Sequence, residues 1–93
     1  MPEDPDDEPG ARARKAFRHA VDRELEALEA HERAAVRHDE IAARHDTAAS
    51  DGTPEQQARM TELAATERER ARHARERAES VRARLRADGV ELG

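Results

Sequence analysis

The sequence contains no cysteine, tryptophan or tyrosine, and Phe17 is its single phenylalanine. A chain without cysteine forms no disulfide bond and binds no metal through thiolates, so disulfide scaffolds and cysteine-based zinc sites are excluded. Only 11 of the 93 residues are leucine, isoleucine, valine or phenylalanine, whereas 20 are alanine. This content is too low for a β-sandwich, a barrel, a nucleotide-binding α/β fold or an enzyme with a deep pocket. Long alanine-rich helices or a disordered chain remain.

Long apolar runs are also missing, because the longest contain three residues, as at 34–36 and 41–43. A membrane-spanning helix needs about 20 apolar residues, so we expect no such helix and no membrane partner. The first ten residues, MPEDPDDEPG, have neither the basic start nor the apolar centre of a signal peptide. We therefore expect a cytoplasmic protein.

Charged residues make up 42% of the chain, and the formal net charge is −5. Residues 1–10 contain five acidic residues, three prolines and no basic residue, so this segment alone accounts for the imbalance. A segment of this composition buries too little apolar surface to fold. We therefore predict a disordered acidic tail over residues 1–10.

Two long segments, 11–49 and 54–88, consist mostly of alanine, glutamate and arginine, which are strong helix formers. Only four residues, 50–53, separate them, so the second helix has to return along the first. The sequence predicts an all-α fold, an antiparallel, coiled-coil-like hairpin of two helices over 11–88. Residues 89–93 are expected to form a C-terminal cap and a short tail.

The turn carries the most specific local signals in the chain. Thr53 and Gln56 form a Thr-x-x-Gln capping box, with a proline between them at the first helical position. Gly52 is expected to adopt the left-handed conformation that closes the first helix. At the far end, Gly89 is the expected cap glycine, with Val90 placed to touch the last turn of the second helix.

Apolar residues recur along both segments with the spacing of a coiled-coil seam. In the first helix three adjacent heptad columns form the apolar face, and a column that carries histidines lies between the other two. The predicted seam consists of Phe17, Val21, Leu28, Ala35, Ala42, Ala64, Ala71, Ala74, Ala78, Val81 and Leu85. The arginines that flank the seam of the second helix are Arg68, Arg75 and Arg82 on one side and Arg70, Arg77 and Arg84 on the other.

Large apolar side chains are few for two helices of this length, so the burial of apolar surface in one hairpin is small compared with the entropy lost on ordering it. A lone hairpin is therefore expected to be marginally stable. We predict self-association, most simply two hairpins that form a four-helix bundle.

His31, His38 and His45 recur every seven residues in the middle column of the apolar face. This spacing separates successive rings by about 10.5 Å, so two of them on one helix cannot share a metal ion. Glu67 falls level with the stretch between His31 and His38, and two copies together offer two histidines and two carboxylates for a divalent metal. A pH-responsive interface, which loses structure between about pH 7 and 5, is another alternative. The simplest interpretation is that these polar residues set register and oligomer state.

Nucleic-acid binding is a further alternative. The first helix opens with four basic residues, Arg12, Arg14, Lys15 and Arg18. The arginine-rich stretch 68–86 returns beside them in a hairpin, which creates one basic end for phosphate contacts. The acidic tail is attached to the same end and would compete for this patch. No nucleic-acid-binding motif accompanies it.

The stretch AHERAAVRHDEIAARHD, residues 30–46, resembles the alanine, arginine, glutamate and histidine heptads of short helical proteins from high-GC actinobacteria. The resemblance covers the first helix and implies no catalytic or binding residue. No serine has an evident base and no glycine-rich phosphate loop is present, so we expect no catalytic residue and no cofactor. We predict a non-enzymatic interaction or scaffold protein whose partner is itself, as a homodimer, or another helical protein.

Overall fold

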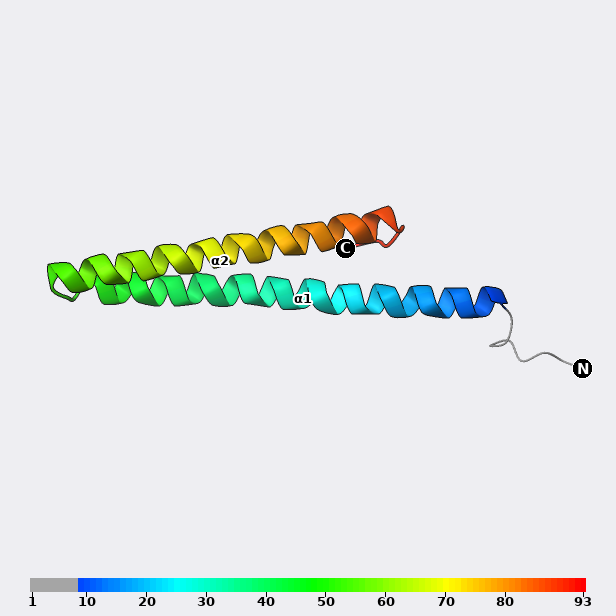
Figure 1. The fold of residues 1–93 in the computed structure, drawn as a ribbon, viewed down its shortest axis with the longest axis horizontal. Helices are drawn as coiled ribbons and strands as arrows, with labels where there is room; N and C mark the ends of the chain where they lie inside the picture. The colour runs from blue at the N-terminus through cyan, green and yellow to red at the C-terminus, as the bar shows by residue number, and fades with distance from the viewer. Residues whose placement is uncertain (1–8) are drawn as a thin grey trace, which may run out of the picture.

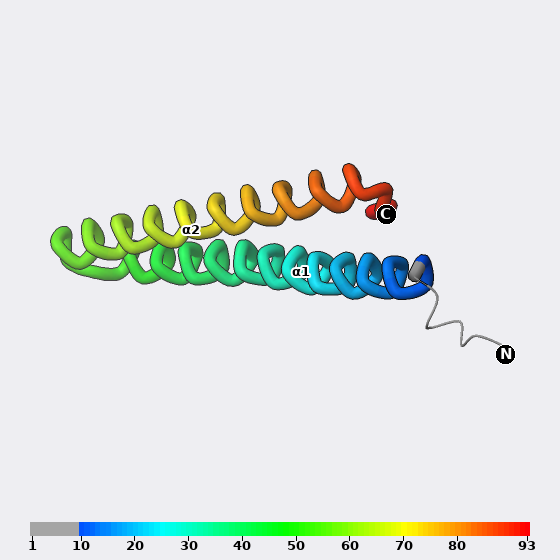
Figure 2. The backbone as a smooth tube through the Cα atoms, turned by 45° about the vertical axis from the view of Figure 1, so that its right-hand side comes forward, coloured from blue at the N-terminus to red at the C-terminus, as the bar shows by residue number. Residues whose placement is uncertain are grey.

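The computed structural model describes residues 9–93, and within them the chain forms two helices and no strand (Figure 1). Helix α1 spans Pro9–Ala49 and helix α2 spans Pro54–Ala87. The chain reverses direction between them, and the helices lie side by side in both views of the backbone (Figures 1 and 2). The predicted all-α antiparallel hairpin is confirmed.

The helix bounds differ slightly from the prediction, because α1 begins two residues earlier and α2 ends one residue earlier. Proline suits the first turn of a helix, where its missing N–H would have no partner. The predicted disordered tail over residues 1–10 is therefore wrong for Pro9 and Gly10, which belong to α1. Residues 1–8 of that tail lie outside the part of the chain that the structure describes.

The turn over residues 50–53 contains the predicted capping box. The amide of Gln56 donates to the hydroxyl oxygen of Thr53 at 3.2 Å, and the amide of Thr53 donates to the side-chain carbonyl of Gln56 at 2.8 Å. The prediction of a left-handed Gly52 is wrong, because Gly89 is the only described glycine with a positive φ. Glycine is needed here for a different reason, which is the space it leaves for the Gln56 side chain. A Cβ at residue 52 would lie 2.9 Å from the Cβ of Gln56.

Helix α2 ends in the predicted glycine cap, where Gly89 has a φ of 82°. The amide of Gly89 donates to the Arg86 carbonyl at 3.0 Å. The amide of Val90 donates to the Leu85 carbonyl at 2.9 Å, which completes a Schellman motif. The chain then folds back (Figure 1), so that Val90 and Leu92 pack against the core.

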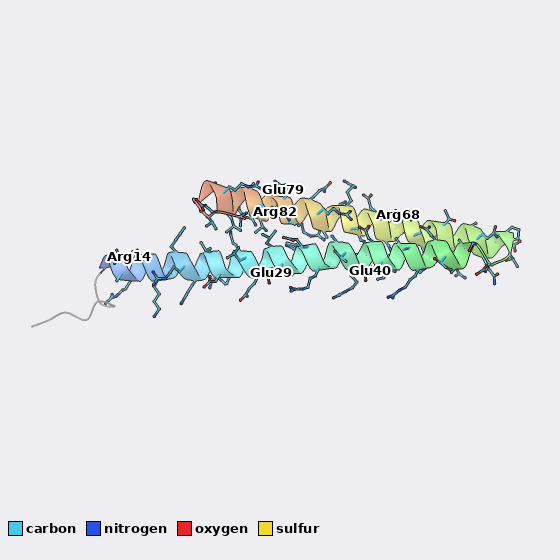
Figure 3. The ribbon with its side chains drawn as sticks, turned by 180° about the vertical axis from the view of Figure 1, so that it is seen from behind. Arg14, Glu29, Glu40, Arg68, Glu79 and Arg82 are labelled. Carbon is cyan, nitrogen blue, oxygen red and sulfur yellow. The ribbon has the colours of Figure 1, made fainter. Side chains whose placement is uncertain are left out.

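The buried side chains change in size along the seam. Near the turn they are alanines such as Ala42 and Ala64, whereas the open end of the hairpin contains Leu28 and Leu85. The helices lie closest near the turn and diverge toward the open end (Figures 1 and 3). Because the distance between packed helices follows the size of the side chains between them, this divergence follows from the sequence.

Helix α1 has 41 residues and α2 has 34, so the first part of α1 extends beyond α2 (Figure 1). Phe17 lies in this part and is 49% exposed, so the prediction that it belongs to the seam is wrong. At this level α2 has already ended. Phe17 instead lines a shallow recess together with Val21 and Val90.

Candidate functional site

The buried residues follow two neighbouring heptad columns of α2 and one column of α1. On α2 they are Ala64, Glu67, Ala71, Ala74, Ala78, Val81 and Leu85. On α1 they are Leu28, Ala35 and Ala42, one in every seven residues. Of the predicted seam residues, Phe17 is exposed and Val21 is half-buried, and the others are buried. The seam is narrow because a single partner helix covers only one strip of α1.

One flank of the seam, which we call the ion-pair flank, is closed by three ion pairs between the helices. The pairs are Asp46 with Arg68, Asp39 with Arg75, and Glu32 with Arg82, the last at 3.1 Å. Figure 3 shows two of these arginines, Arg68 and Arg82, along α2. Successive pairs lie seven residues apart on both helices, so all three fit one register. Partly exposed pairs of this kind contribute at most about 1 kcal/mol each, so each of them adds little to the stability of the hairpin.

The opposite flank, which we call the histidine flank, carries four half-buried residues of α1: Glu24, His31, His38 and His45. The prediction that the histidines occupy the middle of the buried stripe is wrong. Helix α2 packs on the neighbouring column, which contains Leu28, Ala35 and Ala42. A hairpin buries a narrow strip of each helix, so the histidine column lies at the edge of the seam.

Glu67 is the one charged residue classed as buried among residues 10–93, with an exposed fraction of 9%. The Nδ1–H of His38 donates to Oε2 of Glu67 at 2.6 Å, and Nη1 of Arg70 donates to Oε1 at 2.8 Å. The hydrogen bond from His38 is the main cause that lowers the pKa of Glu67 below its ordinary value of 4.5, although partial burial acts in the opposite direction. Both carboxylate oxygens have a donor, so the buried charge is satisfied.

The three histidines have different surroundings. His38 meets Glu67, whereas His31 lines an open recess together with Arg77 of α2. Within the described part of the chain, no three histidine, aspartate or glutamate side chains are placed to hold a metal ion. The divalent-metal alternative draws on His31, His38, His45 and Glu67 of two copies of the chain and stays a prediction.

The arginines near the end of α2 are paired with acidic residues. Nε of Arg84 lies 3.4 Å from Oε1 of Glu24, and Nη1 of Arg86 lies 3.2 Å from Oε1 of Glu79. The hydrogen bond from Arg86 is the main cause that lowers the pKa of Glu79. These pairs neutralise part of the basic end that the nucleic-acid alternative requires. Arg14, which belongs to the same predicted patch, lies on the extended start of α1 (Figure 3).

Glu24 has one carboxylate oxygen without a partner. Its Oε1 faces Arg84, but its Oε2 is buried and receives no hydrogen bond from any described residue. A buried acceptor without a donor costs free energy. This oxygen therefore marks a position on the histidine flank where a donor is missing.

Apolar side chains remain uncovered on both flanks. Val36 is 58% exposed and lines a recess with Arg75, which places it on the ion-pair flank. Leu63 is 40% exposed and lies one heptad before Arg70, so it is on the histidine flank. Ile41 of α1 is half-buried.

The acidic partners on the ion-pair flank and the environment of Glu24 were not predicted from the sequence. The sequence does contain a signal for the acidic partners, because Glu32, Asp39 and Asp46 recur every seven residues, like the arginines opposite them. The unpaired oxygen of Glu24 has no sequence signal, since it depends on where Arg84 lies.

No protein-family model, curated protein or solved structure matches this chain. Over residues 9–93, neither helix has an apolar stretch long enough to cross a membrane. Function therefore has to be inferred from the hairpin itself, from its small core and its two unlike flanks.

Proposed function

We propose that this chain is a non-enzymatic interaction or scaffold protein that self-associates through its hairpin, most simply as a homodimer that forms a four-helix bundle. The observation that carries this proposal is the make-up of the core. Nine apolar residues are buried in the described part of the chain, and six of them are alanine. The large buried side chains are those of Leu28, Val81 and Leu85.

A core of this size is small for two helices of 41 and 34 residues. Each ordered residue loses about 1–2 kcal/mol of backbone entropy, and burial of a methyl group offsets little of this loss. Chains with so small a core commonly gain stability by oligomerisation. A four-helix bundle also gives each helix two neighbours, which suits the two apolar columns of α1, on either side of the histidine column, better than a single partner helix does.

Sedimentation velocity and circular dichroism, measured from about 1 µM to about 200 µM, test the proposal. We expect the mass to rise from 10.4 kDa toward twice that value, with helicity rising in parallel. A fully helical species with the mass of one chain at every concentration would contradict self-association. A monomer of low helicity would also contradict it, and would indicate a chain that folds on another helical protein.

A pH-responsive bundle is a second candidate, and the contact between His38 and Glu67 favours a response through the Glu67 carboxylate over the expected response of the histidines between pH 7 and 5. The Glu67 carboxylate lies 2.6 Å from Nδ1 of His38, so this contact holds as long as Glu67 is ionised. At this position we therefore expect no loss of structure between pH 7 and 5. Structure is instead lost at lower pH, where Glu67 itself takes up a proton. Circular dichroism from pH 7 to pH 3 tests this order, and loss of helicity complete by pH 5 would contradict it.

A further inference from the structure

Helix α1 carries an apolar column that α2 does not cover. We call it the outer column, and its members are Ala20, Ala27, Ala34, Ile41 and Ala48. The three central members are half-buried, and the two at the ends are exposed. The histidine column separates the outer column from the seam. A further helix can therefore lie on the outer column without displacing the seam of the hairpin.

We infer that the outer column is the surface through which two copies of this chain meet, with α1 packed antiparallel against α1 of the second copy and a two-fold axis at Ala34. This inference rests on the proposed self-association and specifies its surface. A two-fold interface is made by the same patch on both copies, so the patch has to be complementary to itself. The outer column is symmetric about Ala34 in its spacing, with two members on each side at seven and fourteen residues.

The sizes of the side chains favour the antiparallel arrangement. Ile41 and Ala27 lie seven residues on either side of Ala34, so an antiparallel copy sets the isoleucine of each chain against the alanine of the other. Large side chains opposite small ones fill such an interface evenly. A parallel copy in the same register would set isoleucine against isoleucine and alanine against alanine, which leaves gaps beside Ala27 and Ala34.

The same arrangement sets a histidine of each copy beside an acidic residue of the other, Glu24. Glu24 lies ten residues before Ala34 and His45 lies eleven residues after it, both on the histidine flank. An antiparallel copy therefore brings His45 to within about 1.5 Å of the level of Glu24 along the helix axis. The Glu24 side chain is 31% exposed, so its carboxylate is accessible to the imidazole of a second copy, which offers an N–H donor to this acidic group. Because the two-fold axis creates this pair twice, a second copy of the chain fits this surface better than an unrelated helix.

Disulfide cross-linking tests the arrangement without background, because the natural chain contains no cysteine. We expect Ala34→Cys to form a cross-linked dimer by itself on mild oxidation. Ala20→Cys and Ala48→Cys should not cross-link when each is alone, but should cross-link when the two are mixed. Efficient cross-linking of Ala20→Cys with itself would show a parallel pair and overturn the antiparallel arrangement. If Ala34→Cys cross-links with itself but the mixture of Ala20→Cys and Ala48→Cys gives no product, the antiparallel arrangement is overturned as well.

A pair of glutamate substitutions on the two flanks tests the surface. Ile41→Glu places a charge in the proposed interface of both copies and should weaken dimerisation at least about tenfold. Val36→Glu introduces the same charge on the ion-pair flank and should leave the dimerisation constant unchanged. A dimer of wild-type strength in Ile41→Glu would show that the surface is wrong while self-association stands. A wild-type chain that is monomeric throughout would instead refute the proposed function itself.

Discussion

Replacement of Leu85 by alanine is expected to be the most destabilising single truncation of an apolar side chain in this hairpin. Leu85 has an exposed fraction of 0% and belongs to the cluster that also contains Leu28 and Val81. Truncation of a buried leucine costs about 2–5 kcal/mol, from lost burial and from the cavity left behind. Val90 and Leu92 pack against this cluster from the folded-back end of the chain and can move into the space. We therefore expect a value near the lower end, about 2–3 kcal/mol.

Urea unfolding followed by circular dichroism, at one fixed protein concentration, measures this change. Leu63→Ala is the matched control, because it makes the same change on the same helix at a residue that is 40% exposed. It should lower the free energy of unfolding by less than about 1 kcal/mol. Equal losses for the two variants would refute the placement of the core at the open end of the hairpin.

Three further predictions concern the two caps and the buried carboxylate. Thr53→Ala removes the side-chain acceptor of the capping box and should lower the free energy of unfolding by about 1 kcal/mol, measured by urea denaturation against wild type. Gly89→Ala should cost about 1–2 kcal/mol in the same assay, because a side chain is strained at a φ of 82°. Glu67 has a lowered pKa, so its contribution to stability is present above its ordinary value of 4.5 and is lost as the pH falls through the lower value of the folded state. The urea midpoint between pH 6 and pH 3 should therefore fall more steeply in wild type than in Glu67→Gln, and parallel curves would contradict the role of this carboxylate.

Local features of the fold were predictable because each depends on residues close together in the chain. The capping box needs only Thr53 and Gln56, and the cap at Gly89 needs only the last turn of the helix before it. The seam of α2 was predictable as well, since its alanines keep the coiled-coil spacing from Ala64 to Ala78. In these cases the local sequence already contains both partners of the interaction.

Features that depend on the relative placement of the helices were predicted less well. The heptad pattern of α1 shows two apolar columns with the histidine column between them. It does not indicate which of these columns meets α2, so the histidines were placed one column too far toward the centre. Phe17 fits the column pattern equally well and is exposed because α2 ends before reaching its level. Gly52 has the residue type of a left-handed cap but instead makes room for Gln56. Each difference arises from tertiary contacts that the local pattern does not contain.

The seam repeats every seven residues, and this repetition has a consequence for register. If α2 slipped by one heptad, Glu67 would still face a histidine, His31 or His45 in place of His38. On the ion-pair flank, two of the three acidic residues would also still lie opposite an arginine. The polar contacts along the seam are therefore compatible with more than one register. The register has to be selected at the ends of the hairpin, by the four-residue turn at one end and by the leucine cluster with its folded-back chain terminus at the other.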